Sequence, residues 1–422
     1  MSEFFNYSER TEKLGKEALE SVKPYFERIE EISEYNQQKM LRAFIDGGVS
    51  ETMFSGSTGY GYDDRGREVI DRVFAQAVGA EDALVRHNFT CGTHTLAVAL
   101  FGVLRTGDTM LCVTGTPYDT IHSVIGINGA GEGEGSLKEY GINYKQVDLK
   151  DGLIDLEAIE NAVDEKTTMV YIQRSRGYEL RKSFSVSEIG EAIKVAKKKN
   201  KNVIVMVDNC YGEFTEKTEP VSVGADLMAG SLIKNPGAGI ARTGGYIAGR
   251  HDLVERCAFR LTTPGLGREV GATLGMSREL FMGIYHAPSV VKEALKTAVF
   301  TSRLFELMGF EVTPRADEER HDIIQAIKLE KAENLIAFCQ GMQKGAPIDS
   351  FVAPEPSDMP GYDSKVIMSA GAFTLGSSIE LSADGPLREP YAVWMQGGTI
   401  FYSAKTGILL AAEEVMKRNE EI

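Results

Sequence analysis

Short apolar segments alternate with longer helical segments between residues 68 and 248, and this alternation constrains the fold of the chain more than any other feature. The pattern predicts an open, mostly parallel sheet with helices on both faces. Ligands of such sheets bind beyond the carboxyl ends of the strands, so functional residues are expected there. The predicted strands are residues 83–85, 110–113, 142–147, 168–172, 203–207, 227–229 and 245–248.

The chain has 422 residues, which is more than one simple hydrophobic core accommodates. We expect an N-terminal helical arm over residues 1–50, a large α/β domain over residues 51–300 and a smaller α+β domain over residues 301–422. Residues 51–67 interleave glycine with tyrosine, which predicts an ordered loop, because glycine permits tight backbone turns while tyrosine rings pack on something.

The balance of charge narrows the range of partners. The chain has 46 basic and 61 acidic residues, a net charge of -15, which disfavours binding to nucleic acid or to an anionic membrane. Its five cysteines are dispersed and include no C-x-x-C pair, which is typical of reduced thiols. Residues 1–16 carry charges throughout and contain no apolar signal core. We therefore expect a soluble, cytoplasmic protein.

Two charged residues follow predicted strands. Asp208 comes directly after the apolar run 203–207, where an acid either caps the next turn or keeps the ring nitrogen of pyridoxal phosphate protonated. Lys234 follows the strand at 227–229 and precedes an Asn-Pro-Gly turn. We expect a partly desolvated amine there, with a lowered pKa, although a surface lysine fits the same local pattern.

Three further groups of residues are suited to bind a phosphate or a flat ring. Cys91, Gly92 and Thr93 precede an apolar helix, and small residues at a helix N-terminus leave N–H groups free for an anion. Ser231, three residues before the lysine, offers a hydroxyl to the same phosphate. Tyr118 follows a predicted strand, where its ring either stacks on a flat cofactor or packs on the core.

In this order along an α/β chain, these residues resemble the fold type I pyridoxal-phosphate enzymes, and most closely the methionine gamma-lyase-like family also named for aluminium resistance and cystathionine beta-lyase activity. The resemblance implies pyridoxal 5'-phosphate as the cofactor and a homo-oligomer with shared active sites, a dimer or a homotetramer. It is carried by residues 57–67, 91–94, 115–118, 207–209, 231–236 and 381–390.

The resemblance also implies roles for single residues. Lys234 corresponds to the Schiff-base lysine, Asp208 to the partner of the pyridine nitrogen and Tyr118 to the residue that stacks on the ring. The residues that correspond to the phosphate site are Cys91, Gly92, Thr93 and Ser231, with Tyr62 and Arg65 reaching it from a neighbouring subunit.

Recognition of the substrate is less well defined by the pattern. Arg388 is our candidate for the clamp on the substrate carboxylate, since a guanidinium binds a carboxylate in a bidentate fashion, although a surface arginine in a Pro-flanked loop fits as well. The better-known lyases have a hydroxyl residue where this chain has Ile233, and an asparagine in the loop that here contains Arg174 and Arg176. Either of these two arginines is expected to contact a cofactor oxygen or a substrate acid.

We therefore expect a carbon–sulfur lyase that removes the Cα proton of a sulfur amino acid such as cystathionine, cysteine or methionine and carries out β- or γ-elimination. An aminotransferase or an aldolase on the same scaffold is the alternative among enzymes. Outside enzymes, the family label suggests a protein that sequesters metal ions for resistance. Acidic pairs such as Asp63-Asp64 lack the spacing of a hard-cation loop, so no metal site is expected.

Overall fold

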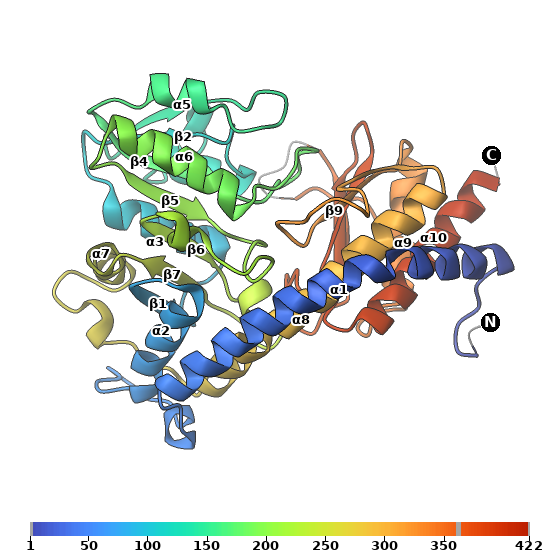
Figure 1. The fold of residues 1–422 in the computed structure, drawn as a ribbon, viewed down its shortest axis with the longest axis horizontal. Coiled ribbons are helices and arrows are strands. Elements are labelled where there is room, and N and C mark those ends of the chain that lie inside the picture. The colour runs from blue at the N-terminus through green and yellow to red at the C-terminus, as the bar shows by residue number, and fades with distance from the viewer. Residues whose placement is uncertain (1–2, 360–363, 421–422) are drawn as a thin grey trace. The chain divides into compact units, whose positions relative to one another are not determined.

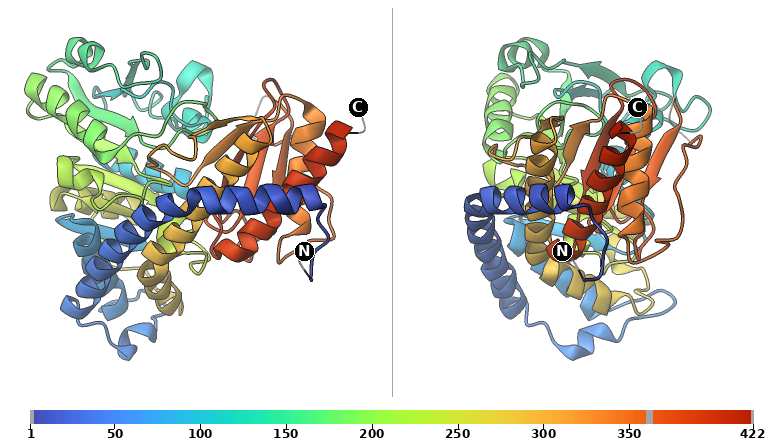
Figure 2. Two further views of the ribbon diagram at one scale, coloured as in Figure 1. Left: turned by 45° about the vertical axis from the view of Figure 1, so that its right-hand side comes forward. Right: turned by 90° about the vertical axis from the view of Figure 1, so that its right-hand side faces the viewer.

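The computed structural model describes residues 3–359 and 364–420, and its chain forms two compact units (Figure 1 and Figure 2). The large unit consists of Tyr35–Gly177 and Arg181–Ala287. The small unit takes in the described residues of Met1–Glu34, Tyr178–Leu180 and Pro288–Ile422.

These units differ from the predicted domain limits. Most of the predicted N-terminal arm belongs to the small unit, where Ala18 is fully buried in the core and Gly15 lies so close to Leu409 that an added Cβ would be 2.7 Å from its Cδ2 atom. The second limit lies at Pro288, within a helix, rather than near residue 300. The reason is that the apolar positions of a long helix continue without a break, so its sequence pattern does not mark where one core ends.

The large unit contains the predicted, mostly parallel sheet. Its strand order is β1-β7-β6-β5-β4-β2-β3. In this order, β6, β5, β4, β2 and β3 pair in parallel with one another. Strand β7 is antiparallel to both of its neighbours, β1 and β6. All seven predicted strands are confirmed. They are β1 (Asp82–Arg86), β2 (Thr109–Cys112), β3 (Asn143–Gln146), β4 (Thr167–Gln173), β5 (Ile204–Asp208), β6 (Leu227–Ser231) and β7 (Gly245–Gly249).

Helices connect these strands. One hydrophobic core joins alternate side chains of the strands to helices that include α3 and α7. Ser185 and Glu188 form a capping box at the start of α6, in which each side chain accepts a hydrogen bond from the backbone N–H of the other residue. The helices are α2 (Arg65–Val78), α3 (Gly92–Val103), α4 (Asp119–Ile125), α5 (Leu156–Ala162), α6 (Val186–Lys199) and α7 (His251–Leu261), with short 3-10 turns at η1 (Glu51–Phe54), η2 (Ile127–Gly129), η3 (Pro220–Val223), η4 (Asn235–Gly237) and η5 (Gly267–Glu269). Two long helices, α1 (Glu9–Asp46) and α8 (Ser277–Leu307), contribute residues to both units.

The small unit contains an antiparallel sheet in the order β10-β11-β12-β9-β8, which agrees with the predicted α+β domain. Two helices that follow α8 pack with this sheet, and residues of α1 and α8 complete the core of the unit. Its elements are β8 (Glu311–Thr313), β9 (Gln325–Lys328), α9 (Ala332–Lys344), β10 (Val366–Ser369), β11 (Ser382–Pro386), β12 (Ala392–Gln396) and α10 (Phe401–Glu420).

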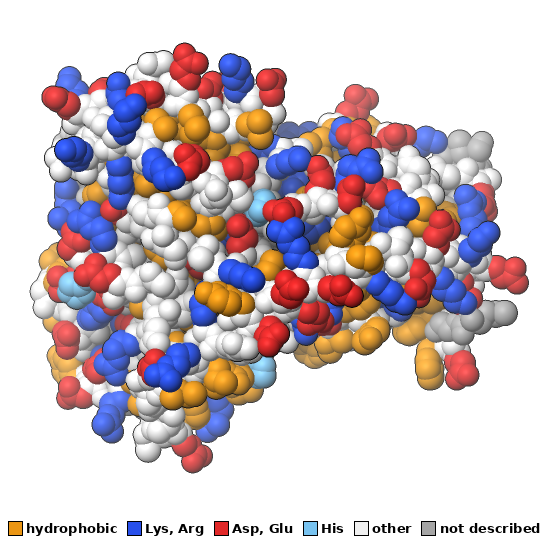
Figure 3. All heavy atoms as spheres, in the orientation of Figure 1, with side chains coloured by type: hydrophobic (Ala, Val, Ile, Leu, Met, Phe, Trp, Pro, Cys, Tyr) orange, Lys and Arg blue, Asp and Glu red, His pale blue; other side chains and the backbone are white. Residues whose placement is uncertain are grey.

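Charged side chains of both signs are interspersed over the face of the molecule in Figure 3. Within the described parts of the chain, every helix is too short or too polar to cross a membrane.

Candidate active site

Three neighbouring strands bring distant residues of the sequence to one edge of the large sheet. Strands β4, β5 and β6 pair in parallel, so their carboxyl ends lie side by side. Gln173 at the end of β4 is in register with Asp208 at the end of β5, and the next residue, Asn209, donates its N–H to Ala229 O of β6 at 3.0 Å. Lys234 lies three residues beyond β6. The predicted acid and lysine therefore belong to one edge of one sheet.

The Asp208 carboxylate is buried and hydrogen-bonded. Its Oδ1 atom accepts the N–H of Cys210 at 3.1 Å, and its Oδ2 atom accepts the Tyr171 hydroxyl at 3.4 Å. Burial raises the pKa of Asp208, while the charge of Lys234 and these hydrogen bonds oppose that rise. The charge of Lys234 therefore influences the ionisation of Asp208, as expected for an amine near a buried acid.

The Lys234 amine lies over the ring of Tyr211, with 4.1 Å between Nζ and the ring centroid. The prediction that the pKa of this amine falls is wrong. Burial does lower the pKa of Lys234, but the groups around the amine outweigh it and raise the pKa above its ordinary value. Those groups are, from the largest contribution, Cys210, Tyr211, Asp208 and Glu213.

The N-terminus of α3 lies beside the end of β6. A Cβ added to Gly92 would be 3.5 Å from Ser231 Cβ, and the Ser231 side chain is fully buried. Cys91 is the N-terminal cap of α3, and the Thr93 hydroxyl lies 2.7 Å from that of Thr120 in the first turn of α4. The predicted phosphate residues of this chain are therefore adjacent, at a helix N-terminus that favours an anion.

Tyr118 stands at the same edge, beyond β2. Its backbone N–H donates to Gln173 Oε1 at 2.6 Å, which ties it to the end of β4. Gly177 leaves room for its ring, because a Cβ on that glycine would be 3.1 Å from Tyr118 Cδ2. The position is compatible with the predicted stacking on a flat cofactor, which stays a prediction.

Arg174 has a structural role, and this argues against the predicted contact with substrate or cofactor. Its guanidinium is fully buried, and each of its three nitrogen atoms donates hydrogen bonds within the large unit. The acceptors are Phe184 O for Nε, Asn209 Oδ1, Gly212 O and Glu219 Oε2 for Nη1, and Thr215 Oγ1 and Glu216 Oε1 for Nη2. Arg176 is also fully buried, and its contact with substrate stays a prediction.

The predicted loop over residues 51–67 is confirmed for residues 55–64, whereas Glu51–Phe54 forms the 3-10 turn η1 and Arg65–Arg67 begins α2. Arg67 of α2 holds this glycine-rich loop by donating to Gly61 O at 2.7 Å and to Gly271 O at 2.8 Å. Gly61 has a φ of 63°, and an added Cβ would lie 2.8 Å from Ala272 N. This residue therefore has to be glycine, both for its backbone conformation and for the close approach of the facing loop.

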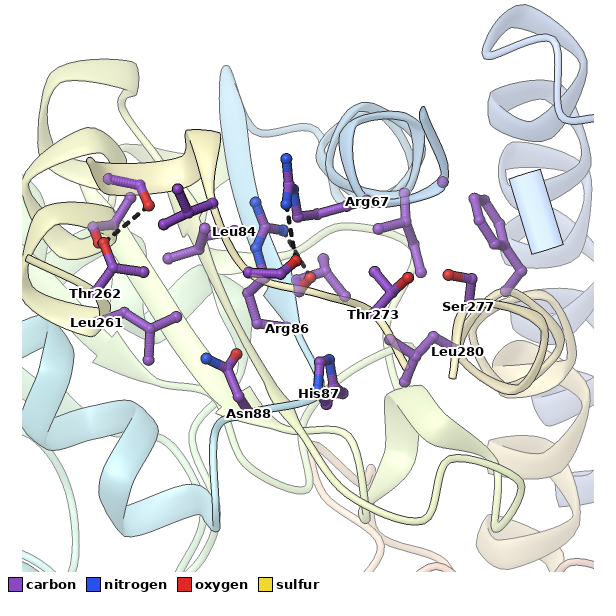
Figure 4. Close-up of a pocket in the computed structure, with 18 residues that line it drawn as sticks. Arg67, Leu84, Arg86, His87, Asn88, Leu261, Thr262, Thr273, Ser277 and Leu280 are labelled. Atoms are coloured by element: carbon purple, nitrogen blue, oxygen red, sulfur yellow. Dashed lines mark hydrogen bonds between the residues drawn. The ribbon is translucent and has the colours of Figure 1, made fainter. Parts of the chain in front are cut away.

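A small cavity lies next to this loop (Figure 4). Its volume is about 20 Å³, and its lining includes Arg67, Arg86, His87, Thr273 and Ser277. A cavity of this size holds about one water molecule, so it is far too small for the predicted cofactor. The cavity belongs to the packing around the loop and is not the active site.

Tyr62 and Arg65 are both exposed at the end of the glycine-rich loop. The rings of Tyr60 and Tyr62 stack with their centroids 5.4 Å apart, and 60% of Tyr62 remains accessible. Neither residue is buried by its own chain, so both are available to a second copy. Their contact with a neighbouring phosphate site stays a prediction.

Arg388 lies in the turn between β11 and β12 of the small unit and is exposed. Its backbone N–H donates to Pro386 O at 2.8 Å, which shapes the turn. Its role as the carboxylate clamp stays a prediction.

One buried residue of the site escaped the sequence reasoning. Glu213, five residues after Asp208, has no exposed surface and accepts a hydrogen bond from the Tyr246 hydroxyl at 2.8 Å. An acidic residue soon after a predicted strand could have been noticed in the sequence. However, an ordinary loop residue often stands at the same distance from a strand end. Within residues 3–359 and 364–420, no three His, Cys, Asp or Glu side chains are grouped so as to hold a metal ion.

Comparisons with known proteins agree with this geometry. The family model described as methionine gamma-lyase matches residues 11–416. A solved carbon–sulfur lyase involved in aluminum resistance from Clostridium novyi NT is 51% identical, with a TM-score of 0.93 over 96% of each chain. The uncharacterized protein YnbB of Bacillus subtilis (strain 168) is 48% identical over 419 residues, 99% of each sequence. The pyridoxal-5'-phosphate dependent protein YhfS from Escherichia coli shares the fold alone, at 15% identity and a TM-score of 0.62 over 92% of this chain and 97% of that one.

Proposed function

Because the chain belongs to the methionine gamma-lyase family, we propose that it is a pyridoxal 5'-phosphate-dependent carbon–sulfur lyase that acts on a sulfur amino acid. The observation that carries this proposal is the meeting of Lys234, Asp208 and the N-terminus of α3 at one edge of the large sheet. These groups fit the cofactor, since they supply an amine for its aldehyde, a buried acid for its ring nitrogen and a helix N-terminus for its phosphate.

Each residue of the site has a defined task in this proposal. When bound, pyridoxal phosphate supplies a conjugated ring that accepts electron density from Cα of the substrate. Lys234 would hold the cofactor through its side-chain amine, and the same amine would accept the Cα proton of the substrate. Asp208 would hold a proton at the ring nitrogen, and Tyr118 would pack against the ring.

The products follow from the elimination. Loss of the sulfur substituent from Cβ or Cγ, with uptake of water, yields a thiol (hydrogen sulfide in the case of cysteine), ammonia and an α-keto acid. Arg388 and Arg176 are the remaining candidates for the substrate carboxylate. We also propose that Tyr62 and Arg65 complete the phosphate site of a second copy, which makes the active form a homo-oligomer.

An absorption spectrum tests the cofactor assignment. The purified full-length chain is expected to show a visible band that borohydride abolishes, with the reduced cofactor recovered on the peptide that contains Lys234. Lys234→Ala should lose both the band and all turnover. The matched control Lys201→Ala, at an exposed lysine, should keep both. A Lys234→Ala protein that retains the band and the turnover contradicts the proposal.

Product analysis tests the reaction. Cystathionine, cysteine, methionine and threonine are offered separately, and thiol, ammonia and keto acid are measured. A lyase of the proposed kind releases thiol and ammonia in equal amounts from at least one of the sulfur amino acids. Amino transfer without ammonia, or glycine and an aldehyde from threonine, would assign the site to a different reaction.

A further inference from the structure

One buried amide side chain joins two loops at the candidate active site. Gln173 ends β4, and both polar atoms of its side chain are hydrogen-bonded. Its Oε1 atom accepts the backbone N–H of Tyr118 at 2.6 Å, and its Nε2 atom donates to Ser175 O at 3.0 Å. Because one partner is a donor and the other an acceptor, this pair of contacts requires an amide.

The backbone from which this side chain starts is itself fixed. The N–H of Gln173 donates to Thr114 Oγ1 at 3.0 Å, and its carbonyl accepts Arg181 Nη2 at 3.3 Å. Its Cα is in register with that of Asp208, the proposed partner of the ring nitrogen. These backbone bonds form with any side chain at this position, so the end of β4 does not by itself require an amide that reaches Tyr118.

The loop after β4 also contacts the tyrosine ring. A Cβ added to Gly177 would lie 3.1 Å from Tyr118 Cδ2 and 3.5 Å from Gln173 Nε2. The same loop is held to the strand, because Arg181 Nη2 also donates to Ser175 O, at 2.6 Å. Tyr118 is half-buried. The amide therefore fixes the backbone of the tyrosine and also the loop on which one edge of its ring packs.

We propose that Gln173 is a positioning residue that holds the Tyr118 ring in place to stack on the cofactor, an inference that rests on the proposed function of the site. An aromatic ring stabilises a flat partner only in a narrow range of orientations. A ring that is fixed before binding loses little conformational entropy when the cofactor arrives. Without the amide, the Tyr118 N–H and Ser175 O lose their shared partner, and ordering the ring costs affinity.

The affinity for pyridoxal phosphate tests this proposal. Bound cofactor is removed from the full-length chain with hydroxylamine, and pyridoxal phosphate is titrated back while the visible band is recorded. Gln173→Met has a side chain of similar length without the amide, and the Kd should rise about tenfold. Gln146→Met is the matched control, because Gln146 is exposed at the end of β3 in the same sheet, and its Kd should not change.

A double-mutant cycle separates positioning from a general structural role. Tyr118→Ala removes the ring and should itself raise the Kd. In that background Gln173→Met should change the Kd by less than about twofold, because the ring that it positions is gone. Gln173→Glu keeps an acceptor for the Tyr118 N–H and should recover part of the lost affinity. An effect of Gln173→Met that has the same size with and without the ring overturns the proposal, as does an unchanged Kd.

Amide hydrogen exchange gives a second measurement, which needs no cofactor. The Tyr118 N–H, followed by mass spectrometry on the peptide of residues 115–121, should exchange about tenfold faster in Gln173→Met and at the unmodified rate in Gln146→Met. An unchanged rate in Gln173→Met also overturns the proposal.

A shorter side chain replaces Gln173→Met if that variant does not fold, as judged by circular dichroism. Gln173→Asn keeps the polarity but does not reach Tyr118, and it should give the same losses. An unmodified chain that binds no pyridoxal phosphate contradicts the proposed function and this inference with it. Binding by the unmodified chain, without coupling between residues 173 and 118, contradicts this inference alone.

Discussion

The two sheets of the molecule differ in what they collect at their edges. In the parallel sheet of the large unit, consecutive strands end on the same side, so Asp208 and Lys234 meet although 25 residues separate them in sequence. In the antiparallel sheet of the small unit, neighbouring strands end on opposite sides, and the buried acid Asp384 lies within β11 instead. Strand direction thus decides whether scattered polar residues become a site.

The two units also differ in the surroundings of their buried acids, Glu213 and Asp384. Burial raises the pKa of Asp384 to about 6, against the opposing hydrogen bonds from Tyr178 and Gln396. Burial and the charge of Glu219 raise the pKa of Glu213 to about 8, against the opposing hydrogen bonds from its own backbone N–H and from Tyr246 and the charge of Lys234. Both acids accept hydrogen bonds from neutral donors, and the difference between them is that the charge of a lysine acts on Glu213.

The largest expected effect is a difference in turnover between a variant in the large sheet and a variant in the small sheet. Asp208→Asn removes the charge that keeps the cofactor nitrogen protonated, and turnover should fall about a hundredfold or more, the scale of acid–base effects in enzymes. The matched change in the other sheet, Asp384→Asn, should leave turnover within about threefold. Steady-state rates of both variants with the same sulfur amino acid check this, and equal losses would break the comparison.

The next effect concerns stability. Arg174→Met leaves the buried carboxylate of Glu219 and the half-buried carboxylate of Glu216 without the cation that contacts both, and the free energy of unfolding should fall by about 3–5 kcal/mol. Arg388→Ala, at an exposed turn of the small unit, should change it by less than about 0.5 kcal/mol. Urea denaturation followed by circular dichroism measures both. A small effect at Arg174 would return this residue to the candidates for binding.

A third prediction uses the pH dependence of stability. Both buried acids bind a proton more tightly in the folded than in the unfolded chain, so each makes the folded state less stable as pH rises between its unfolded and its folded pKa. For Glu213 this window runs from 4.5 to about 8, and for Asp384 from 3.8 to about 6. In the first window, the free energy of unfolding should fall with pH by at most about 1.4 kcal/mol per pH unit because of Glu213, and Glu213→Gln should remove this dependence. Asp384→Asn should remove the corresponding dependence in the second window. Unfolding curves at pH 5, 6 and 7.5 distinguish them, because above pH 6 only the Glu213→Gln variant should differ in slope from the unmodified chain.

The smallest expected effect tests the one substrate candidate in the small unit. If Arg388 clamps the carboxylate, Arg388→Ala should raise KM about tenfold, the size of one lost hydrogen bond between charged groups, with a smaller change in kcat. Glu389→Ala in the same turn is the control. An unchanged KM would confine the chemistry to the large unit and leave Arg176 as the candidate.

The sequence by itself determined the parallel sheet and the pair at its edge. Apolar runs such as 203–207 are local features, and a residue that ends such a run, like Asp208, has to emerge at the edge of the sheet. The position of Lys234, after the next strand, is predicted by the same rule. Gly92 and Ser231 were both assigned to one phosphate from the sequence, and in the structure they lie side by side.

The tertiary structure alone decided what surrounds these groups. Arg174 looked like a binding residue until Glu216 and Glu219, more than 40 residues later, were seen to bond it. Glu213 and the raised pKa of Lys234 depend on which acids fold against one amine. Local sequence sets the path of the backbone, but the charge of a buried group depends on neighbours from every part of the chain, because electrostatic interactions are long-ranged where water is excluded.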